Sequence, residues 1–465
     1  MTVGVGGSVA RLVLDTAERR PGAAFGTVEE PVPLAAAVAR GAGFARRLAA
    51  EHGLRPGDRV ALVGTTSTSY LTAWLGLQLA GVEAALVNPT YTDDMLRTLL
   101  AGLDPAALVV SGRSLSLSSS PSSPSSPLSS PLSSPSEASG RLSRIPVIDA
   151  TDLSTAGDDG DPAGLPGLDR DDLDVAGYMH TSGTTGLPKF CAQSHAYFRR
   201  LGAAISGALG LRPDDVVFAP LPMYHVNPLG YGVLGALTAG AGVLGARRFS
   251  ASEFWDQVVA HDVSALVLHA PPVEILKRST TPAPEHRVRA MFFGDAEFLR
   301  RFGIDRAVTA YGSTEAGGVT HLHVWTAAEA AAVDEATEGP ISRYGGEARA
   351  DVDWRVDDDG AIRVRAVEPG ALFSGYLVDG VVTPAVDEDG WFDTGDIGAV
   401  DPRTGGLRFV ERRAESVRVK GEYVPIPLVE SALAGLRGVD DLAVWKRPGP
   451  LGDGDDEVVL FTAPA

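Results

Sequence analysis

A run of hydroxyl and glycine residues ends in a lysine at residues 181–189, TSGTTGLPK. Glycines let backbone N–H groups approach anionic oxygens, hydroxyls add donors, and a lysine adds positive charge. The spacing is not that of a Walker P-loop. Lysine is also rare in this chain, since only four of the 40 basic residues are lysines, at positions 189, 277, 420 and 446. We interpret the run as a phosphate-binding loop rather than a flexible Gly/Thr turn.

Further polar motifs follow the loop in a fixed order. FFGDAE (292–297) and YGSTEAGG (311–318) each end a short apolar run, and GWFDTGDIG (390–398) comes later. APLPMYHVNPLG (219–230) contains a histidine, and VERRAESVRVKGEYVPIPLVE (410–430) is rich in arginine. Together with PGDRVAL and VNPTYTDDML, these motifs resemble the AMP-forming adenylating enzymes: acyl- and aryl-CoA synthetases, peptide-synthetase adenylation domains and luciferases. The resemblance extends over nearly the whole chain.

The resemblance implies a reaction that joins a carboxylate to the α-phosphate of ATP, with Mg²⁺ as the counter-charge. The implied catalytic residues are Lys189, His225, Thr314 and Glu315, and Glu315 is the implied metal ligand. The implied nucleotide-binding residues are Thr181, Ser182, Gly183, Thr184, Thr185, Gly186, Lys189, Gly294, Asp295, Ala296, Tyr311, Gly312, Ser313, Thr314, Asp396 and Arg412.

Each implied role has a physical reason. A carboxylate such as Glu315 suits a hard cation that also binds phosphate. The ring of Tyr311 offers a flat face to adenine, beside the backbone of residues 294–296. Asp396 can accept hydrogen bonds from ribose hydroxyls, while Arg412 donates to the ribose or phosphate side and Thr314 to the α-phosphate.

The other candidate side chains have competing interpretations. In the family the position of His225 lines and gates the acyl pocket, although a histidine beside prolines is often only a surface or core residue. His269 and His321 could face the same pocket or simply pack in the core. Cys191 is interpreted as buried, because no base is identifiable near it.

The bulk composition excludes several classes of protein. The net charge is −19, which argues against nucleic-acid binding, and an anionic ligand then needs local donors or a metal. One cysteine in 465 residues rules out an internal disulfide and fits a reducing, cytoplasmic location. The longest apolar run, residues 230–246, is short and rich in glycine, so we expect a buried helix and strand rather than a membrane span.

Helical and strand patterns alternate along the chain and predict an α/β fold. Residues 33–53 have a helical period that ends at Gly53, and DRVALVG, YLTAWLGLQLAG and VEAALVN follow as strand, helix and strand. This rhythm predicts parallel sheets covered by helices. Residues 216–222, 265–272 and 289–295 read as further buried strands, and Asp359–Gly360 marks a hairpin turn.

We therefore expect two α/β subdomains with parallel-rich sheets, a small β-barrel subdomain at 335–400 and a partial α+β C-terminal domain. The large domain is predicted to span 1–411, and the shortened C-terminal domain 412–465. The Ser/Pro-rich segment 114–139 is expected to be a disordered insertion, because it has too little apolar surface to offset its chain entropy.

The sequence departs from the family pattern in two places. The second residue after Arg412, usually a polar hinge, is Ala414, so domain rotation is altered or Glu415 takes over. No Gly-Lys segment follows Lys446, although the family's lysine there bridges carboxylate and α-phosphate. Its loss would remove about 3 kcal/mol of barrier lowering. The sequence leaves open whether the protein works with half of this domain or the chain is a piece of a longer one.

The leading hypothesis is an ATP-dependent, AMP-forming ligase that adenylates a small carboxylic acid and transfers it to a thiol, which we expect to be that of coenzyme A. One alternative keeps adenylation but uses a carrier protein or an amine as acceptor. In actinobacterial secondary metabolism, some family members activate nitrite to diazotise aryl amines. Another alternative is a nucleotide-binding homologue without turnover. The identity of the acid stays open, and a homodimer is an expectation only.

Overall fold

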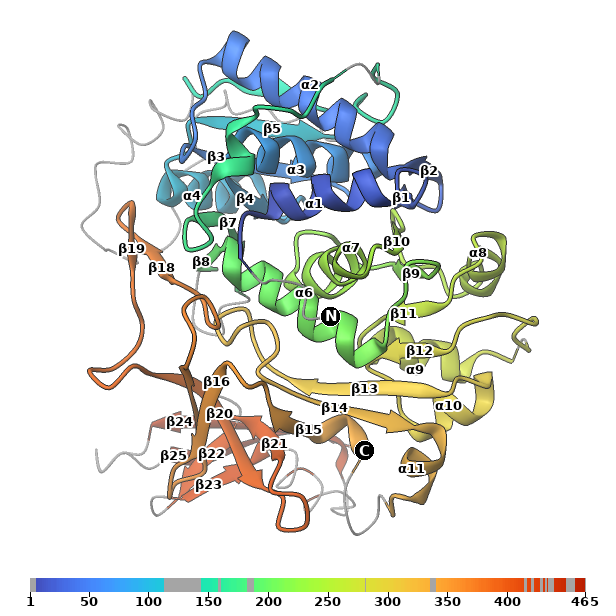
Figure 1. The fold of residues 1–465 in the computed structure, drawn as a ribbon. Helices are drawn as coiled ribbons and strands as arrows, with labels where there is room; N and C mark the ends of the chain where they lie inside the picture. Colours follow the sequence, from blue (N-terminus) through green and yellow to red (C-terminus); the bar gives the residue numbers. More distant parts are fainter. Residues whose placement is uncertain are drawn as a thin grey trace.

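The computed structural model describes residues 6–112, 144–157, 160–181, 188–280, 282–334 and 340–413, together with parts of 416–464. The Ser/Pro segment 114–139 lies outside the described residues, and so do Ser182 to Gly186, Ala414 and Glu415. In the described part the chain forms two large β-sheets with helices on and between them (Figure 1).

The smaller sheet has eight strands in the order β19-β18-β8-β7-β4-β3-β5-β6. Strands β7, β4, β3, β5 and β6 are parallel, and β8, β18 and β19 continue the sheet in antiparallel fashion. The strands are β3 (Arg59–Gly64), β4 (Glu83–Val87), β5 (Ala107–Ser111), β6 (Val147–Asp149), β7 (Val175–His180), β8 (Phe190–Ser194), β18 (Gly375–Val378) and β19 (Val381–Thr383).

The larger sheet has thirteen strands in the order β16-β17-β20-β21-β15-β14-β13-β12-β11-β9-β10-β1-β2. Its middle, from β13 to β1, is parallel, and both flanks are antiparallel. The strands of the parallel part and its edge are β1 (Ala24–Thr27), β2 (Glu30–Pro33), β9 (Val216–Ala219), β10 (Gly242–Gly245), β11 (Ala265–Val267), β12 (Ala290–Phe292) and β13 (Arg306–Tyr311).

The strands expected at 335–400 are present, but their pairing differs from the expected small barrel. β14 (His321–Thr326), β15 (Tyr344–Ala348), β16 (Val352–Val356), β17 (Ala361–Ala366), β20 (Trp391–Val400) and β21 (Leu407–Arg412) continue the larger sheet. The described pairing shows this run as an open flank, without a pair that closes it into a ring. β18 and β19 leave the run and join the smaller sheet through Tyr376 and Cys191.

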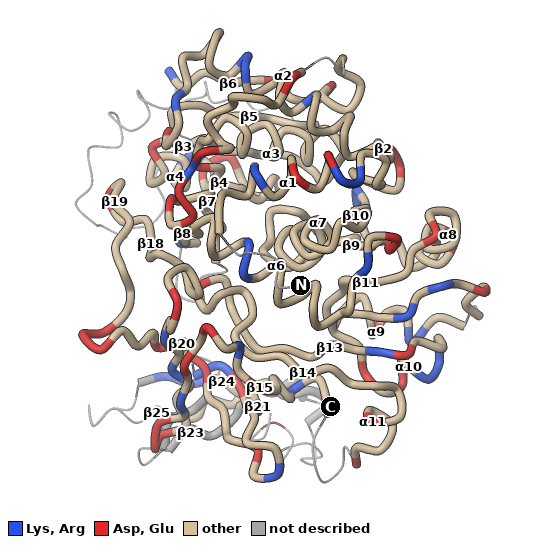
Figure 2. Tube along the Cα trace, in the orientation of Figure 1, with Lys and Arg blue, Asp and Glu red and all other residues tan. Residues whose placement is uncertain are grey.

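Helices cover the sheets and fill the space between them. α6 contacts β8 of the smaller sheet and β13 and β14 of the larger one, and it lies between the two lobes with α7 (Figure 1). α3 is buried along its whole length and, like α7, carries no charged residue (Figure 2). The helices are α1 (Val9–Arg19), α2 (Leu34–His52), α3 (Thr68–Ala80), α4 (Asp93–Leu103), α6 (His195–Leu209), α7 (Gly235–Ala239), α8 (Phe254–Ala260), α9 (Ala270–Arg278), α10 (Ala296–Phe302) and α11 (Ala327–Ala332).

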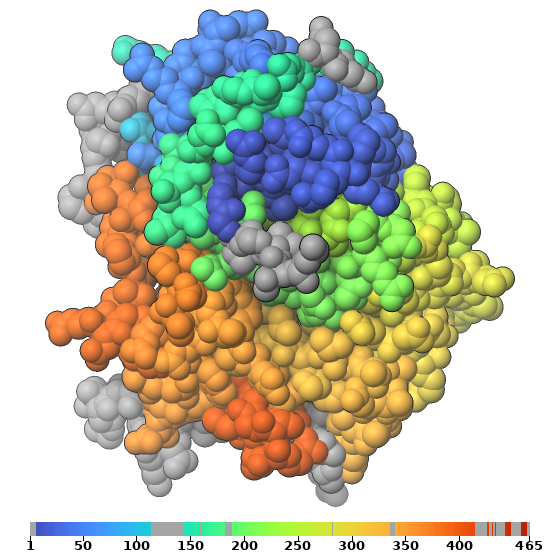
Figure 3. All heavy atoms as spheres, in the orientation of Figure 1, coloured from blue at the N-terminus to red at the C-terminus, as the bar shows by residue number. Residues whose placement is uncertain are grey.

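Irregular helices and a C-terminal piece complete the fold. η1 (Pro166–Asp169) and η3 (Ile341–Arg343) are 3₁₀ turns, and η2 (Asn227–Leu234) is a π-helix that runs into α7. After residue 413 the structure describes two antiparallel strand pairs, β22 (Ser416–Val419) with β23 (Glu422–Pro425) and β24 (Val439–Pro448) with β25 (Asp456–Pro464). The N-terminal lobe packs directly on the middle of the chain (Figure 3).

Candidate active site

Most of the predicted site residues come from loops at the carboxyl ends of parallel strands, whereas Asp396 and Arg412 lie in the antiparallel strands β20 and β21. Thr181 follows β7, His225 follows β9, and Gly294 follows β12. The segment that contains Thr314 and Glu315 follows β13. Carboxyl ends of neighbouring parallel strands meet at one edge of a sheet, which is where open α/β sheets place their ligands.

The two ends of the predicted phosphate loop lie side by side. The Thr181 N–H donates to the carbonyl oxygen of Lys189 at 3.0 Å, so a backbone hydrogen bond closes the base of the loop between β7 and β8. The predicted residues Ser182 to Gly186 lie outside the described residues. Lys189 is exposed, as a group that meets a soluble ligand must be.

Tyr376 contacts both Lys189, the predicted phosphate-binding residue, and Glu315, the predicted metal ligand. Its hydroxyl donates to Oε1 of Glu315 at 3.0 Å, and the ammonium of Lys189 stands 5.1 Å from the centre of its ring. Burial and the nearby Glu315 charge raise the pKa of the Tyr376 hydroxyl, which therefore stays protonated and remains a donor. β18 thus brings one side chain to both the predicted phosphate lysine and the predicted metal ligand.

The segment after β13, which contains Thr314 and Glu315, is fixed by hydrogen bonds to its backbone. The buried Tyr197 of α6 donates to the carbonyl of Thr314 at 2.9 Å. Ser313 Oγ accepts from the Ala316 N–H at 3.1 Å, so this hydroxyl stabilises the turn. A side chain at Gly312 would collide with the backbone of Gly318, so the turn requires glycine there.

Tyr311 and Asp396 form the best-defined polar contact of the site. The Tyr311 hydroxyl donates to Asp396 Oδ2 at 2.8 Å. The other carboxylate oxygen, Oδ1, has no hydrogen-bond partner in the described part of the chain; Arg412 Nε lies 3.6 Å away. Asp396 and Arg412 are paired residues of β20 and β21. Burial, and to a lesser extent the Glu315 charge, raise the pKa of Asp396, whereas Tyr311 and Arg412 oppose this shift.

The predicted adenine segment has a structural role that the sequence did not reveal. Asp295 Oδ1 accepts from the Phe298 N–H at 2.8 Å and caps α10, and Oδ2 binds Lys277 at 2.6 Å. Phe293, just before Gly294, has φ of 70°, a left-handed conformation that costs a bulky residue energy. The strand end is therefore fixed by a cap and an ion pair, and the adenine contact of the Gly294 and Ala296 backbone stays a prediction.

The histidines divide into two groups. His225 and His269 are exposed, and each lies at the carboxyl edge of the larger sheet. His321 is completely buried, shares a 3.0 Å hydrogen bond with the Thr320 hydroxyl and meets Trp354 edge-on. It is therefore a packing histidine. Cys191 is fully buried as predicted, and burial raises the pKa of its thiol.

Sequence reasoning missed an ion pair beside the predicted hinge. The two terminal guanidinium nitrogens of Arg413, Nη1 and Nη2, donate to Asp393 at 3.0 and 2.8 Å. Burial alone would raise the pKa of Asp393, but the bonds from Arg413 outweigh it and leave the pKa low. Lys446 also reaches this place, where its ammonium donates to the Arg413 carbonyl at 3.1 Å. The run of arginines before Ala414 was the available signal.

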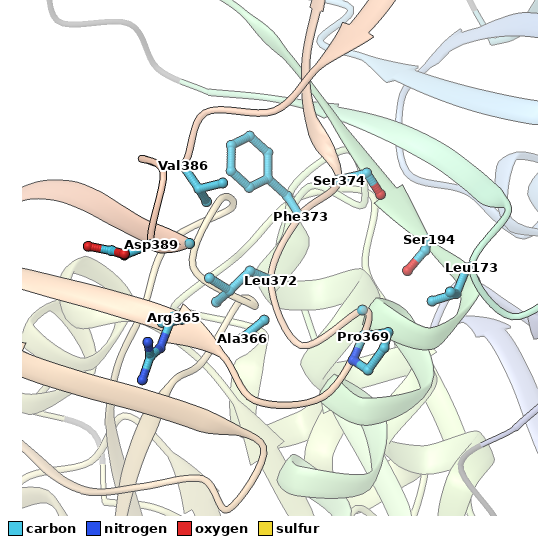
Figure 4. A pocket seen from close by; sticks show the side chains of 12 residues that line it. Leu173, Ser194, Arg365, Ala366, Pro369, Leu372, Phe373, Ser374, Val386 and Asp389 are labelled. Carbon is cyan, nitrogen blue, oxygen red and sulfur yellow. The ribbon is translucent and has the colours of Figure 1, made fainter.

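A separate pocket of about 520 Å³ lies between the end of β17, the loop 369–374 that leads to β18, and Ser194 before α6 (Figure 4). Apolar side chains such as Leu372, Phe373 and Val386 line it, with Arg365 and Asp389 at its edge. None of the predicted site residues is part of its lining. Phe373 links it to the site, because its N–H donates to the Glu315 carbonyl at 3.0 Å.

Comparison with known proteins identifies the class that this fold and site define. The model of the AMP-binding enzyme family matches residues 35–376. The chain therefore belongs to the AMP-binding enzymes, and the resemblance to adenylate-forming ligases is confirmed. No helix in the described residues is long and apolar enough to cross a membrane.

Individual relatives include CoA ligases and a fatty acid transport protein. The chain is 29% identical over 432 residues to the medium/long-chain-fatty-acid–CoA ligase of Mycobacterium tuberculosis, covering 85% of this chain and 67% of the relative. It is 25% identical to the crotonobetaine/carnitine–CoA ligase of Salmonella agona, covering 84% and 76%, and it spans 65% of mouse long-chain fatty acid transport protein 1. The chain thus spans about two-thirds to three-quarters of these relatives.

The fold matches solved adenylate-forming enzymes over nearly the whole chain. Unliganded o-succinylbenzoate CoA synthetase from Bacillus subtilis aligns with a TM-score of 0.75 at 18% identity, covering 99% of this chain and 94% of that one. ATP-bound MatB from Rhodopseudomonas palustris aligns with a TM-score of 0.73 at 22% identity, covering 98% and 89%. These likenesses confirm the predicted α/β fold.

Proposed function

We propose that the protein is an ATP-dependent, AMP-forming ligase that adenylates a small carboxylic acid and transfers the acyl group to the thiol of coenzyme A. One observation carries this proposal: Tyr376 joins Lys189 and Glu315, two residues from distant motifs, at the carboxyl edge of the sheets. Family membership and the CoA ligases among the relatives support the same reaction.

The chemistry has two steps. A carboxylate oxygen of the acid attacks the α-phosphorus of ATP, the bond to the bridging oxygen breaks, and pyrophosphate leaves. The CoA thiolate then attacks the acyl carbon and expels AMP. In the first step an anion approaches a polyanion, so positive charge and fixed donors must be in place beforehand.

The chain's own residues fit an ATP–Mg²⁺ complex. In the described contacts Tyr376 uses only Oε1 of Glu315, which leaves the second oxygen for a hard cation such as Mg²⁺. The buried Oδ1 of Asp396 accepts no hydrogen bond from the described residues, with Arg412 Nε at 3.6 Å, and suits a ribose hydroxyl. Lys189 would neutralise the phosphate tail, and Mg²⁺ would supply charge stabilisation at the phosphates when bound. Thr314, His225 and Arg412 keep their predicted roles at the α-phosphate, the acid and the nucleotide.

The test is pyrophosphate release with a panel of short acids, with and without coenzyme A, together with calorimetric ATP binding. The double variant Lys189→Met/Glu315→Gln should lose both ATP–Mg²⁺ binding and turnover. Glu297→Gln, an exposed carboxylate on α10, is the matched control and should retain both. The proposal fails if the double variant binds ATP as tightly as the wild type.

Mass spectrometry of the products distinguishes the acceptors. An acyl-CoA product supports the proposal, whereas an acylated carrier protein, or a diazo product from nitrite and an aryl amine, supports the alternatives. Tight ATP binding without pyrophosphate from any acid would indicate the homologue without turnover. A cytoplasmic location, where ATP and coenzyme A are available, belongs to the proposal, and light scattering tests the expected homodimer.

A further inference from the structure

His180, which none of the predicted roles uses, lies at the centre of a cluster of polar aromatic side chains. It ends β7 and contacts Tyr91, whose ring centre is 5.4 Å away and which follows β4. It also stacks on Tyr224 at 5.9 Å and meets His225 edge-on at 5.9 Å. Tyr224 and His225 follow β9 of the larger sheet, so the cluster joins the carboxyl edges of both sheets.

His180 has a buried polar atom without a partner. His180 is 6% exposed, and its Nδ1 lies 3.2 Å from the Tyr91 hydroxyl. Its Nε2 meets no hydrogen-bond partner among the described residues. When Tyr91 donates to Nδ1, the one proton of the neutral ring sits on Nε2. A buried N–H without an acceptor costs free energy, so a ligand oxygen there would be stabilised.

The backbone of His180 lies beside the phosphate loop, where it precedes Thr181 and pairs with Phe190 of β8, but its ring contacts Tyr91, Tyr224 and His225. In the smaller sheet β8 and β18 lie on one side of β7, with Lys189 and Tyr376, whereas β4 lies on the other. The contact between His180 and Tyr91 is on the β4 side. Burial, and then the neighbouring His225, lower the pKa of His180 to about 4. A neutral donor among aromatic rings suits one oxygen of a small molecule better than a polyphosphate, which needs cations.

We propose that His180, with the exposed His225 beside it, forms a subsite for a second oxygen of the acid substrate. The substrate is then a short acid with an additional carboxylate, keto or hydroxyl group at the end remote from the reacting carboxylate. A long apolar chain would leave the His180 N–H buried without an acceptor. This inference rests on the proposed function and names its substrate class.

The experiment compares acids of equal length that differ in the second oxygen: succinate and 4-hydroxybutyrate against butyrate, with octanoate as the long-chain probe. Specificity constants come from pyrophosphate release. The wild type should favour at least one oxygenated acid over butyrate by about tenfold or more. His180→Phe keeps an aromatic ring without the donor and should abolish this preference, while kcat/KM for butyrate and KM for ATP stay unchanged.

Two further variants separate recognition from folding. His180→Gln keeps an N–H donor and should retain part of the preference. His286→Phe alters another stacked histidine, which lies in the segment before β12 with its ring 4.7 Å from that of Trp255 on α8, and should change nothing. Circular dichroism and thermal melting confirm that each variant folds.

Three outcomes would overturn the inference. The first is a wild-type preference for butyrate or octanoate, and the second is an unchanged preference in His180→Phe. The third is an equal rise in KM for ATP with every acid, which would place His180 at the phosphates. If no acid releases pyrophosphate, the proposed function fails. Calorimetric binding of succinate to the wild type and His180→Phe then still decides the subsite: equal binding overturns it, and weaker binding to the variant supports it.

Discussion

Replacing Asp396 with asparagine should weaken ATP binding without destabilising the protein. Asp396 is 3% exposed, accepts one hydrogen bond from Tyr311 on Oδ2 and has no described hydrogen-bond donor on Oδ1. Asparagine has nearly the same shape, and its carbonyl oxygen can still accept from Tyr311. The substitution therefore removes the charge and turns one acceptor into a donor, while the packing stays the same.

The loss of ATP affinity follows from the hydrogen bonds that a ribose would make. A hydrogen bond to a charged group contributes about 1.5–3 kcal/mol. Losing the charge on a carboxylate that accepts from ribose should therefore weaken ATP binding by about 10- to 150-fold, since about 1.4 kcal/mol is tenfold.

Asp396→Asn should lower ATP affinity, but it should not lower the free energy of unfolding. Burial is the largest cause that raises the pKa of Asp396, so the fold favours the protonated form. This carboxylate therefore costs stability as pH rises through its native pKa, and the cost is absent below its unfolded pKa. At neutral pH the free energy of unfolding of Asp396→Asn should equal or exceed that of the wild type. ATP affinity of the wild type should rise with pH over the same range, and that of the variant should not.

Asp401→Asn is the matched control. Asp401 is a buried carboxylate on the same hairpin, but its hydrogen bonds outweigh the effect of burial on its pKa, whereas those of Asp396 do not. Burial would raise the pKa of Asp401, but the Arg403 N–H and the Arg408 guanidinium outweigh burial and lower it. This variant should lose about 2 kcal/mol of stability and keep its ATP affinity. Urea unfolding and calorimetry measure both quantities. The reasoning is refuted if Asp396→Asn is the less stable of the two or binds ATP normally.

Three other substitutions test neighbouring contacts. Tyr376→Phe removes the hydroxyl bound to Glu315 and should raise the Mg²⁺ concentration for half-maximal pyrophosphate release about tenfold; an unchanged Mg²⁺ titration would contradict this. Lys277→Met breaks the ion pair with Asp295 and should cost about 1 kcal/mol in urea unfolding. Burial would lower the pKa of Lys277, but Asp295 and Glu274, which lies 2.7 Å from its ammonium, outweigh burial and raise it. The difference in stability from wild type should therefore fade as pH rises through that pKa. Gly76→Ala would place a methyl group 2.9 Å from a backbone oxygen of α2 and should cost about 1–3 kcal/mol, with normal ATP affinity in calorimetry.

Sequence patterns predicted the helices and turns whose signals lie close together in the chain. The helical period at 33–53 corresponds to α2, and Gly53 ends it with φ of 65°. The Asp359–Gly360 turn joins β16 and β17, with Gly360 at φ of 82°. The run 230–246 contains the end of η2, then α7 and β10. In each case the signal lies within one or two turns of the chain.

Long-range pairing was not predictable in the same way. β18 pairs with β8, which lies about 185 residues earlier in the chain, and this pairing brings Tyr376 to Glu315 and Lys189. No local pattern indicates that strand partner, so the residue that joins the two predicted groups was missed. His180 was visible only as the last residue of a strand, because its partners come from β4 and from the other sheet. Asp295 was predicted from its motif, but its ion pair with α9 was not.

Glu315 and Asp396 also explain why nucleotide and metal should bind together. The charge of Glu315 contributes to the raised pKa of Asp396, after burial, so the two carboxylates oppose each other in the protein without ligand. A divalent cation at Glu315 would reverse the local field and favour the ionised form of Asp396, which is the form that accepts from ribose. The coupling is reciprocal, so ATP that binds through Asp396 as proposed would favour a metal at Glu315 to the same extent. The motifs after β13 and in β20 are thus linked through charge as well as through the hydrogen bond from Tyr311.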